Sequence, residues 1–337
     1  MRKFMHRFYN LASGGAEVTI LSFVRAFPED RHFLVFNRFE PSWVSKELRA
    51  RQNVSGFQIE GRDFGKLAAE HRPDVLFWHW YPPMSTEDFG TIPTDLRRRS
   101  IFYNHWFTEV PYVEDLREYW FVTPTSLAET GRCIPPSRAR LLLNPVRAEL
   151  FDVQPWAEPV PSVGRHSRPV GIKFPADFFP LYEGIHVPDL QVRILGCDPA
   201  LIAAVQRESH RLRHAYWLLP SNSMPVPRFL SFVRVYVYKT NDRFREACPV
   251  SILEALAAGI PVVAENKGGI RDLVIPNETG LLCDTLEDYH WGAQMLLTDD
   301  ERWQRFGRRA RQWALENVSS AVYRRKCDEF FTGIVNP

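Results

Sequence analysis

The chain has 337 residues, of which 45% are hydrophobic and 24% are charged, and its formal net charge is +2. This balance excludes a collagen-like, coiled-coil or disordered chain, and so small a net charge gives no support for nucleic-acid binding. The length is sufficient for two hydrophobic cores, so two domains are expected.

Five cysteines are present, and no pair has the Cys-x-x-Cys spacing of a zinc or redox site. The odd number predicts free thiols in a reducing compartment, so a cytoplasmic location is expected. The N-terminal residues lack the apolar segment of a signal peptide, and no apolar run reaches the roughly 20 residues that span a bilayer. The basic segments 308–313 and 323–326 could touch anionic lipid at the inner face of a membrane, although a solvated face is the favoured interpretation.

Apolar runs that suit buried parallel strands alternate with amphipathic helical patterns through the first half of the chain. After a short first strand, a helix is predicted over 16–27, in which Ile20, Leu21, Val24 and Phe27 share one face. Further strands are predicted at 32–36, 74–81, 100–106, 121–125 and 139–146. Strands that alternate with helices predict a parallel sheet with βαβ connections.

A proline-rich region then interrupts the alternation, because Pro155, Pro159 and Pro161 oppose both helix formation and ladder pairing. We interpret it as an interdomain linker. The predicted parts are an N-terminal domain, the linker, a C-terminal domain and a C-terminal helix that could pack back on the N-terminal domain, over residues 1–152, 153–162, 163–318 and 319–337 respectively.

The alternation resumes in the second half of the chain. Strands are predicted at 160–164, 191–196, 215–220, 233–239, 260–266 and 279–284, and helices at 286–297, 300–317 and about 319–332. Ligands of open parallel sheets bind beyond the carboxyl ends of the strands, so two consecutive doubly wound domains would enclose a two-substrate site. The pattern therefore predicts an α/β fold with a cleft between two Rossmann-like domains.

Two adjacent glycines, Gly14 and Gly15 in NLASGGAE, precede the first predicted helix. Glycines let a ligand approach the backbone closely, and the N–H groups at a helix N-terminus suit a diphosphate. A simple tight turn is the alternative interpretation. The pattern is not G-x-G-x-x-G, so the nicotinamide-binding fingerprint is absent.

The segment RFREACPVSILEALAAG (243–259) carries two glutamates at the start of a predicted helix. Pro249 suits the first helical position, so Glu246 should lie in the preceding loop and Glu254 on the helix. A loop glutamate could bind sugar hydroxyls and a helical one a ribose, while the amides near Cys248 and Val250 could face phosphate oxygens. The alternative is a pair of surface charges on an amphipathic helix.

The longer segment REACPVSILEALAAGIPVVAENKGGIRDLVIPNETGLLCD (245–284) resembles the signature of retaining nucleotide-sugar glycosyltransferases of family 4, which have the GT-B fold. In that family, two glutamates separated by seven residues precede A-x-G-x-P-V-V, a Gly-Gly turn and T-G-L-L. Glu246 and Glu254 occupy the glutamate positions, so the resemblance favours their functional interpretation. The other matching residues are Ala257, Gly259, Pro261, Val262, Val263, Gly268, Gly269, Thr279, Gly280, Leu281 and Leu282.

Other segments resemble the same family. SGGAE is similar to its N-terminal glycine loop, and DVLFWHWY and FYNHW are similar to two of its strands that end in histidine. The resemblance implies that His79 lies on the acceptor side and that His105 contacts the donor sugar. SVGRHSRPVGIKFP is similar to the phosphate-binding stretch, which implies Arg165 and Lys173 as diphosphate ligands, with Arg168 as a competitor for the second position.

The resemblance implies a metal-independent, retaining transfer of a sugar from a nucleotide-diphosphate donor to a glycan, lipid-linked or small-molecule acceptor. His105 and Glu246 are the expected catalytic residues, and the leaving diphosphate would accept the acceptor's proton. The alternatives are an epimerase or a phosphorylase of the same fold, and an inactive binding subunit.

No cofactor and no metal are expected beside the nucleotide-sugar co-substrate. The chain has no Asp-x-Asp, H-E-x-x-H, G-x-S-x-G or P-loop motif. The other histidines, His6 and His166 among them, show no metal-ligand spacing and are interpreted as surface or packed residues. The donor base, the sugar, the acceptor and the oligomeric state stay open.

Overall fold

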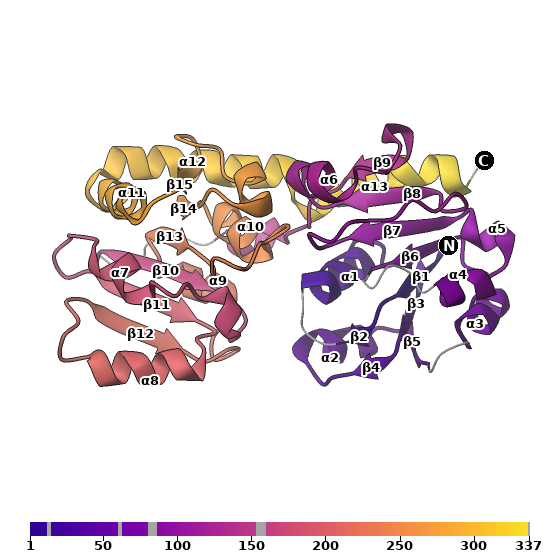
Figure 1. Cartoon of the computed structure of the whole chain (residues 1–337), viewed down its shortest axis with the longest axis horizontal. Coiled ribbons are helices and arrows are strands. Elements are labelled where there is room, and N and C mark those ends of the chain that lie inside the picture. The colour runs from indigo at the N-terminus through magenta and orange to yellow at the C-terminus, as the bar shows by residue number, and fades with distance from the viewer. Residues whose placement is uncertain (12–14, 60–62, 80–85, 153–159, 336–337) are drawn as a thin grey trace. The chain divides into compact units, whose positions relative to one another are not determined.

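The residues described by the computed structural model are 1–11, 15–59, 63–79, 86–152 and 160–335. They form two compact units, Met1–Pro145 with Ser320–Pro337, and Val146–Ser319, which are called the N-terminal and the C-terminal unit (Figure 1). Residues 153–159 of the predicted linker lie outside the described part of the chain.

A parallel sheet forms the centre of the N-terminal unit, and its described strands have the order β5-β3-β1-β6-β7-β8-β9 (Figure 1). These strands are β1 (Lys3–Arg7), β3 (Arg31–Phe36), β5 (Val54–Gln58), β6 (Val75–Trp78), β7 (Ser100–Asn104), β8 (Glu118–Phe121) and β9 (Ala139–Leu141). Successive strands add to one side of β1 and then to the other, so a topological switch point lies between β1 and β6. Two further strands, β2 (Asn10–Leu11) and β4 (Arg38–Phe39), pair with each other.

The helices of the N-terminal unit enclose an aromatic core. Phe4 on β1 contacts Phe23 on the first helix and Phe331 on the last helix, with ring centroids 5.1 and 5.2 Å apart. The C-terminal helix therefore contributes to the core of this unit. The helical elements are α1 (Gly15–Ala26), α2 (Trp43–Arg49), α3 (Asp63–His71), α4 (Thr86–Thr91), α5 (Thr94–Arg97), α6 (Pro124–Thr130), η1 (Pro136–Arg138) and α13 (Ser320–Val335).

The strand predicted at 121–125 is largely wrong. The structure ends β8 at Phe121 and begins α6 at Pro124. Thr123 and Ser126 form a capping box, in which the Thr123 side chain accepts a hydrogen bond from the Ser126 amide. A capping box followed by proline at the first helical position is a strong helix-start signal, and it outweighs the apolar run before it.

The C-terminal unit is built on a second parallel sheet, whose described strands have the order β12-β11-β10-β13-β14-β15 (Figure 1). The strands are β10 (Ser162–His166), β11 (Gln191–Leu195), β12 (Ala215–Leu219), β13 (Val235–Tyr238), β14 (Val262–Glu265) and β15 (Gly280–Cys283). The order again reverses at the first strand, which creates a switch point between β10 and β13. The helical elements are η2 (Ala148–Phe151), η3 (Gly171–Lys173), α7 (Phe178–Glu183), α8 (Pro199–Glu208), α9 (Val226–Leu230), α10 (Val250–Ala257), η4 (Gly268–Asp272), α11 (Leu286–Thr298) and α12 (Asp300–Asn317).

The C-terminal unit begins before the predicted boundary at residue 152. The Val146 amide donates a hydrogen bond to the Val318 carbonyl at 2.8 Å, and η2 packs against α10. Residues 146–152 therefore extend the C-terminal unit. Local pattern could not reveal this, because their partners lie more than 100 positions further along the chain.

The basic segment predicted over 308–313 lies on α12, whose buried face includes Trp303, Phe306 and Trp313. Two of its arginines are paired with acids of the same unit, because Arg309 contacts Glu278 and Arg311 contacts Asp152. Within the described ranges, no helix combines the length and the apolar character needed to cross a membrane. Peripheral lipid contact stays a prediction.

Candidate active site

In the N-terminal unit, the two predicted histidines lie beside each other at the carboxyl ends of neighbouring strands. His79 directly follows β6, and His105 directly follows β7. Nδ1 of His79 and Nε2 of His105 are 3.1 Å apart, and the two rings stack with an interplanar angle of 16°. The sequence placed these residues on two successive predicted strands, and the structure shows that the strands are neighbours and that the two side chains contact each other.

Burial keeps both imidazoles neutral. It lowers the pKa of His105 to about 3 and lowers the pKa of His79 well below its usual value, because a cation in the low-dielectric interior loses its hydration. For His79, the neighbouring His6 and His105 add to this effect. These side chains can therefore accept or donate hydrogen bonds at neutral pH without carrying a charge.

The buried histidines make stability depend on pH. The unfolded chain binds protons below about pH 6.5, whereas folded His105 stays neutral down to about pH 3, so unfolding takes up protons and stability falls as the pH decreases. We expect a loss of about 1 kcal/mol for each such histidine between pH 7.5 and 5.5. Urea denaturation midpoints across this range measure the loss. His105→Asn should reduce the slope, and a variant of the exposed His210 serves as the control; a pH-independent midpoint would contradict the expectation.

The glycine loop is described only in part. Gly14 lies outside the described residues, while Gly15 is exposed and begins α1. The Thr19 hydroxyl donates to the Gly15 carbonyl at 2.9 Å and lies 3.0 Å from the Asn144 side-chain oxygen. A Cβ atom at Gly15 would meet nothing within 4 Å in the described structure, so internal packing does not explain the glycine.

In the C-terminal unit, Glu246 and Lys173 form a partly buried ion pair beside the start of α10. The Lys173 ammonium contacts Glu246 Oε1, and the Tyr238 hydroxyl donates to the same oxygen at 2.6 Å. Burial lowers the pKa of Lys173, while the carboxylate of Glu246 opposes this shift. The Glu246 carbonyl accepts the Gly269 amide at 2.8 Å, which ties this loop to the Gly-Gly turn.

Arg165 has a different environment from the one predicted. Its side chain is fully buried, and its guanidinium lies over the rings of Tyr238 and Phe174, 4.3 and 5.0 Å from their centroids. One Nη atom donates to the Lys173 carbonyl at 2.7 Å, and the other donates to the Lys239 carbonyl. In this arrangement Arg165 supports the backbone of Lys173, and its buried Nε makes no hydrogen bond within the described residues, so a diphosphate contact stays a prediction.

Arg168, the predicted competitor of Lys173, is exposed. Its positive charge contributes to the lowered pKa of Lys173, so the two cations lie within electrostatic reach of each other. The structure therefore places both candidates for the second phosphate contact in one region of the C-terminal unit.

Glu254 lies on α10 and is held by a histidine that the sequence analysis set aside. Nε2 of His166 is 2.7 Å from Glu254 Oε2, and Nδ1 of His166 is 3.1 Å from the Tyr236 hydroxyl. His166 is the last residue of β10, at the carboxyl edge of the switch point. It is a packed histidine, as the sequence analysis expected, and the structure adds that it contacts one of the predicted site residues.

The remaining predicted residues lie at the N-terminus of α10. The helix begins at Val250, and Cys248 is buried directly before Pro249, its N-cap. The first turn of a helix directs N–H groups out of its N-terminus and has positive potential. In the chain, Glu246 precedes this turn and Glu254 follows it.

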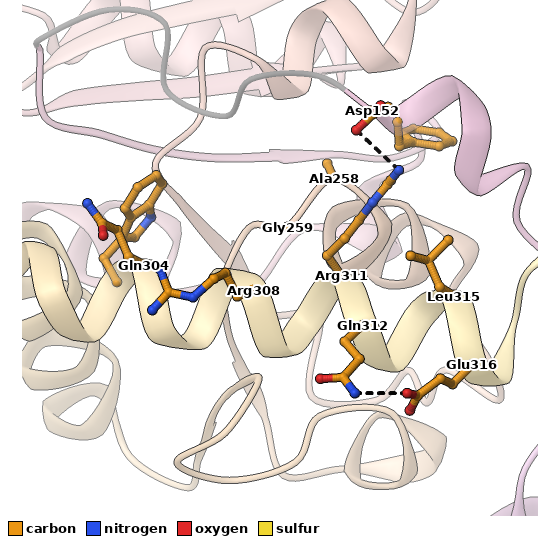
Figure 2. A pocket seen from close by; sticks show the side chains of 12 residues that line it. Asp152, Ala258, Gly259, Gln304, Arg308, Arg311, Gln312, Leu315 and Glu316 are labelled. Atoms are coloured by element: carbon orange, nitrogen blue, oxygen red, sulfur yellow. Dashed lines mark hydrogen bonds and ion pairs between the residues drawn. The ribbon is translucent and has the colours of Figure 1, made fainter.

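A groove of about 680 Å³ lies at the opposite end of α10 (Figure 2). Gly259, which follows that helix with φ of 72°, comes close to Gly307 on α12, where an added Cβ would meet the Gly259 carbonyl oxygen at 2.5 Å. Figure 2 shows Arg311 of α12 reaching Asp152, and its guanidinium also donates to the Ala148 carbonyl at 2.9 Å. Among the described residues that line this groove, there is no predicted site residue.

Comparisons with known proteins show what the chain resembles. Residues 160–313 match the family model described as glycosyl transferases group 1. A stretch of 140 residues is 29% identical to the GDP-mannose-dependent alpha-(1-6)-phosphatidylinositol monomannoside mannosyltransferase of Mycolicibacterium smegmatis. That alignment covers 39% of this chain and 36% of the relative, so it spans little more than a third of that enzyme.

Solved structures share the architecture over nearly the whole chain. A glycosyltransferase from Rickettsia africae aligns with a TM-score of 0.79 at 14% identity, covering 99% of both chains. HepE from Anabaena, solved in complex with UDP-glucose, aligns with a TM-score of 0.76 at 13% identity, covering 99% of this chain and all of the other. The chain has the GT-B fold, so the predicted fold class is confirmed. Within that fold, residues 160–313 are the part that matches the group 1 glycosyltransferases.

Proposed function

We propose that the protein is a glycosyltransferase that moves a sugar from a nucleoside-diphosphate donor to an acceptor, with retention of the anomeric configuration and without a metal ion. One observation carries the proposal: within the part that matches the group 1 family, two supported carboxylates flank the start of α10. Glu246 is paired with Lys173 on one side, and Glu254 is held by His166 on the other.

Each group has a distinct task in the proposed donor complex. Glu254 binds the ribose hydroxyls, the N-terminal amides of α10 near Cys248 and Val250 bind the diphosphate, and Glu246 binds hydroxyls of the donor sugar. Lys173 neutralises the diphosphate, so donor binding replaces its contact with Glu246 by a contact with phosphate oxygen. On the N-terminal unit, His105 hydrogen-bonds the donor sugar, Gly15 lies near the diphosphate and His79 is on the acceptor side.

The proposed reaction breaks the bond between the anomeric carbon and a diphosphate oxygen. Negative charge grows on the leaving phosphate, and Lys173 with the α10 amides stabilises it more in the transition state than in the ground state. The acceptor oxygen bonds to the anomeric carbon from the face that the phosphate leaves, and its proton passes to the released phosphate oxygen. Retention follows because attack and departure occur on one face.

The donor and the acceptor are proposed by class. GDP-mannose, which the name of the mycobacterial relative includes, and UDP-glucose, which is bound in the HepE structure, are the first donors to test. A glycan, a lipid-linked sugar or a small molecule is the proposed acceptor, and the proposed location is cytoplasmic, including the inner face of a membrane.

A thermal-shift screen tests donor binding most simply, because a ligand that binds only the folded state raises the melting temperature. UDP, GDP, ADP, UDP-glucose and GDP-mannose are compared with and without a chelator. We expect one base to stabilise the protein equally in both conditions. NMR of the sugar product formed from the best donor then reports the anomeric configuration. Inversion, or loss of turnover in the chelator, would contradict the corresponding part of the proposal.

Glu254→Gln is expected to weaken binding of the nucleoside diphosphate by at least about tenfold, about 1.4 kcal/mol, because the neutral amide is a poorer partner for two ribose hydroxyls. His166→Gln should weaken binding less, because it acts through the orientation of Glu254. Calorimetric titration of both single variants and the double variant should reveal non-additive effects, since the residues are in contact. Glu278→Gln, at a half-exposed ion pair, is the matched control; unchanged affinity in Glu254→Gln would exclude its ribose role.

A further inference from the structure

Four histidines of the N-terminal unit lie in one diagonal line across four neighbouring strands. Register pairs His32 on β3 with Phe4 on β1, and pairs His6, two residues further along β1, with Phe77 on β6. His79 is two residues beyond Phe77 in the chain. His105 is likewise two residues beyond the residue of β7 that lies next to His79. A step of two residues returns to the same face of a sheet, so all four side chains share one face and progress toward the carboxyl edge.

The rings are linked by the same pair of atoms at every step. Nδ1 of His32 lies 3.5 Å from Nε2 of His6, Nδ1 of His6 lies 3.0 Å from Nε2 of His79, and Nδ1 of His79 lies 3.1 Å from Nε2 of His105. Neighbouring rings are nearly parallel, with interplanar angles of 22, 25 and 16°. The link between His32 and His6 is the longest of the three.

The direction of hydrogen bonding is defined at the His32 end of this line of histidines. Nε2 of His32 is 2.9 Å from the carbonyl oxygen of Phe27. A carbonyl only accepts hydrogen bonds, so the His32 proton must be on Nε2. The second nitrogen of a neutral imidazole is then an acceptor, which requires His6 to donate from its own Nε2.

The same reasoning assigns the tautomer of each following histidine. Burial lowers the pKa of each of the four rings, so each carries a single ring proton at neutral pH. If His6 donates from Nε2, its Nδ1 accepts from His79, and the Nδ1 of His79 accepts from His105. One backbone carbonyl thereby selects the Nε2–H tautomer in four successive residues.

The line ends on an acceptor without a partner. Nδ1 of His105 is a buried atom that makes no hydrogen bond within the described part of the chain, although the residue as a whole is partly exposed. Leaving such an atom unsatisfied costs free energy, so a bound group that donates to it gains affinity. We infer that His32, His6 and His79 are positioning residues that fix His105 as a hydrogen-bond acceptor for a ligand hydroxyl. That the hydroxyl belongs to a donor sugar rests on the proposed function.

Imidazole ¹⁵N NMR of the ligand-free protein tests the tautomers directly, because protonated and unprotonated ring nitrogens resonate far apart. The chain has 10 histidines, and single-site variants assign the four of interest. We expect all four to carry the proton on Nε2 at pH 7.5. A spectrum with Nδ1–H at His79 or His105 would overturn the inference, whatever the protein's activity.

Two substitutions at His6 distinguish an effect of the hydrogen bonds along the line from an effect of ring packing. His6→Asn retains an oxygen near the position of Nδ1, so His79 and His105 should keep the Nε2–H tautomer. His6→Phe keeps a ring between Phe77 and His79 but removes the acceptor, so the tautomers of His79 and His105 should become mixed. If His6→Phe leaves both tautomers unchanged, the line does not set them. If that variant does not fold, the wild-type spectrum still decides.

The ligand part is tested with deoxy and deoxyfluoro forms of the donor that the protein turns over, UDP-glucose or GDP-mannose. A fluorine cannot donate to Nδ1, so at one sugar position both analogues should lose about tenfold or more in kcat/KM. Full activity of every fluoro analogue would overturn the acceptor role of His105. If neither donor is turned over, the proposed function fails. The NMR spectrum tests the histidine tautomers independently of that outcome.

Discussion

Glu246→Gln is expected to lower kcat by about 10²- to 10³-fold, the usual effect of removing one charged contact from a transition state. Glutamine keeps the shape of the side chain and can still accept from the Tyr238 hydroxyl. It loses the negative charge that pairs with Lys173 and that would bind sugar hydroxyls near the reacting carbon. Steady-state kinetics with the best donor measures the change.

The binding of the free nucleoside diphosphate should change by less than about threefold in Glu246→Gln, because the proposed contact is to the sugar. Glu278→Gln is again the control, since it makes the same chemical change at a half-exposed ion pair. Equal turnover of the Glu246 variant and the control would remove Glu246 from the reaction.

Lys173→Met is expected to lower kcat/KM by about 10²- to 10³-fold, because methionine keeps most of the aliphatic stem and removes the cation proposed to stabilise the leaving phosphate. The substitution also leaves Glu246 without its ionic partner in a partly buried site, so a lower melting temperature is expected. Kinetics must therefore be measured well below the melting temperature of the variant.

Lys46→Met, at an exposed lysine of α2, is the matched control for this substitution. The double variant of Lys173 and Glu246 should be less impaired than the product of the two single effects, because each single change leaves a charge without its counter-ion. Full multiplicativity would indicate that the two residues act separately, and unchanged kcat/KM in Lys173→Met would rule out its role at the phosphate.

Much of the fold follows from local pattern. The apolar runs at 191–196 and 260–266 contain β11 and β14, because strands buried on both faces are nearly continuous in hydrophobicity. The run at 215–220 contains β12, which is an apolar but partly exposed edge strand. The start of α10 was predicted from Pro249 to within one residue, because the structure makes Pro249 the N-cap and begins the helix at Val250. By contrast, β5 was not predicted, since this edge strand is only partly buried and lacks a continuous apolar run.

The surroundings of Arg165 could not be derived from the sequence, and its role as a diphosphate ligand stays a prediction. Its position in the phosphate-binding stretch suggested a direct ligand, and a basic residue after an apolar strand is often exposed. Here Tyr238 and Phe174 offer aromatic faces and two carbonyls accept from the Nη atoms, while the buried Nε has no hydrogen-bond partner in the described part of the chain. Only the tertiary arrangement reveals that Lys173, which Arg165 supports, is the more accessible cation.

The histidine contacts could not be derived from sequence. His32, His6, His79 and His105 become neighbours only because the strand order is β3-β1-β6-β7, which no local periodicity specifies. His166 likewise meets Glu254 across 88 positions of the chain. A usable signal existed for three of them, however: His79, His105 and His166 lie at or just after the carboxyl ends of buried parallel strands, where functional side chains collect.

The central claim is that a nucleoside diphosphate binds at the start of α10 between Glu246 and Glu254. A crystal structure with the nucleotide that gives the largest thermal shift tests it most directly. The account predicts ribose hydroxyls on Glu254 and phosphate oxygens at the first turn of α10, with Lys173 turned from Glu246 toward the phosphate. A nucleotide bound elsewhere, for example in the groove beside α12 shown in Figure 2, would contradict it.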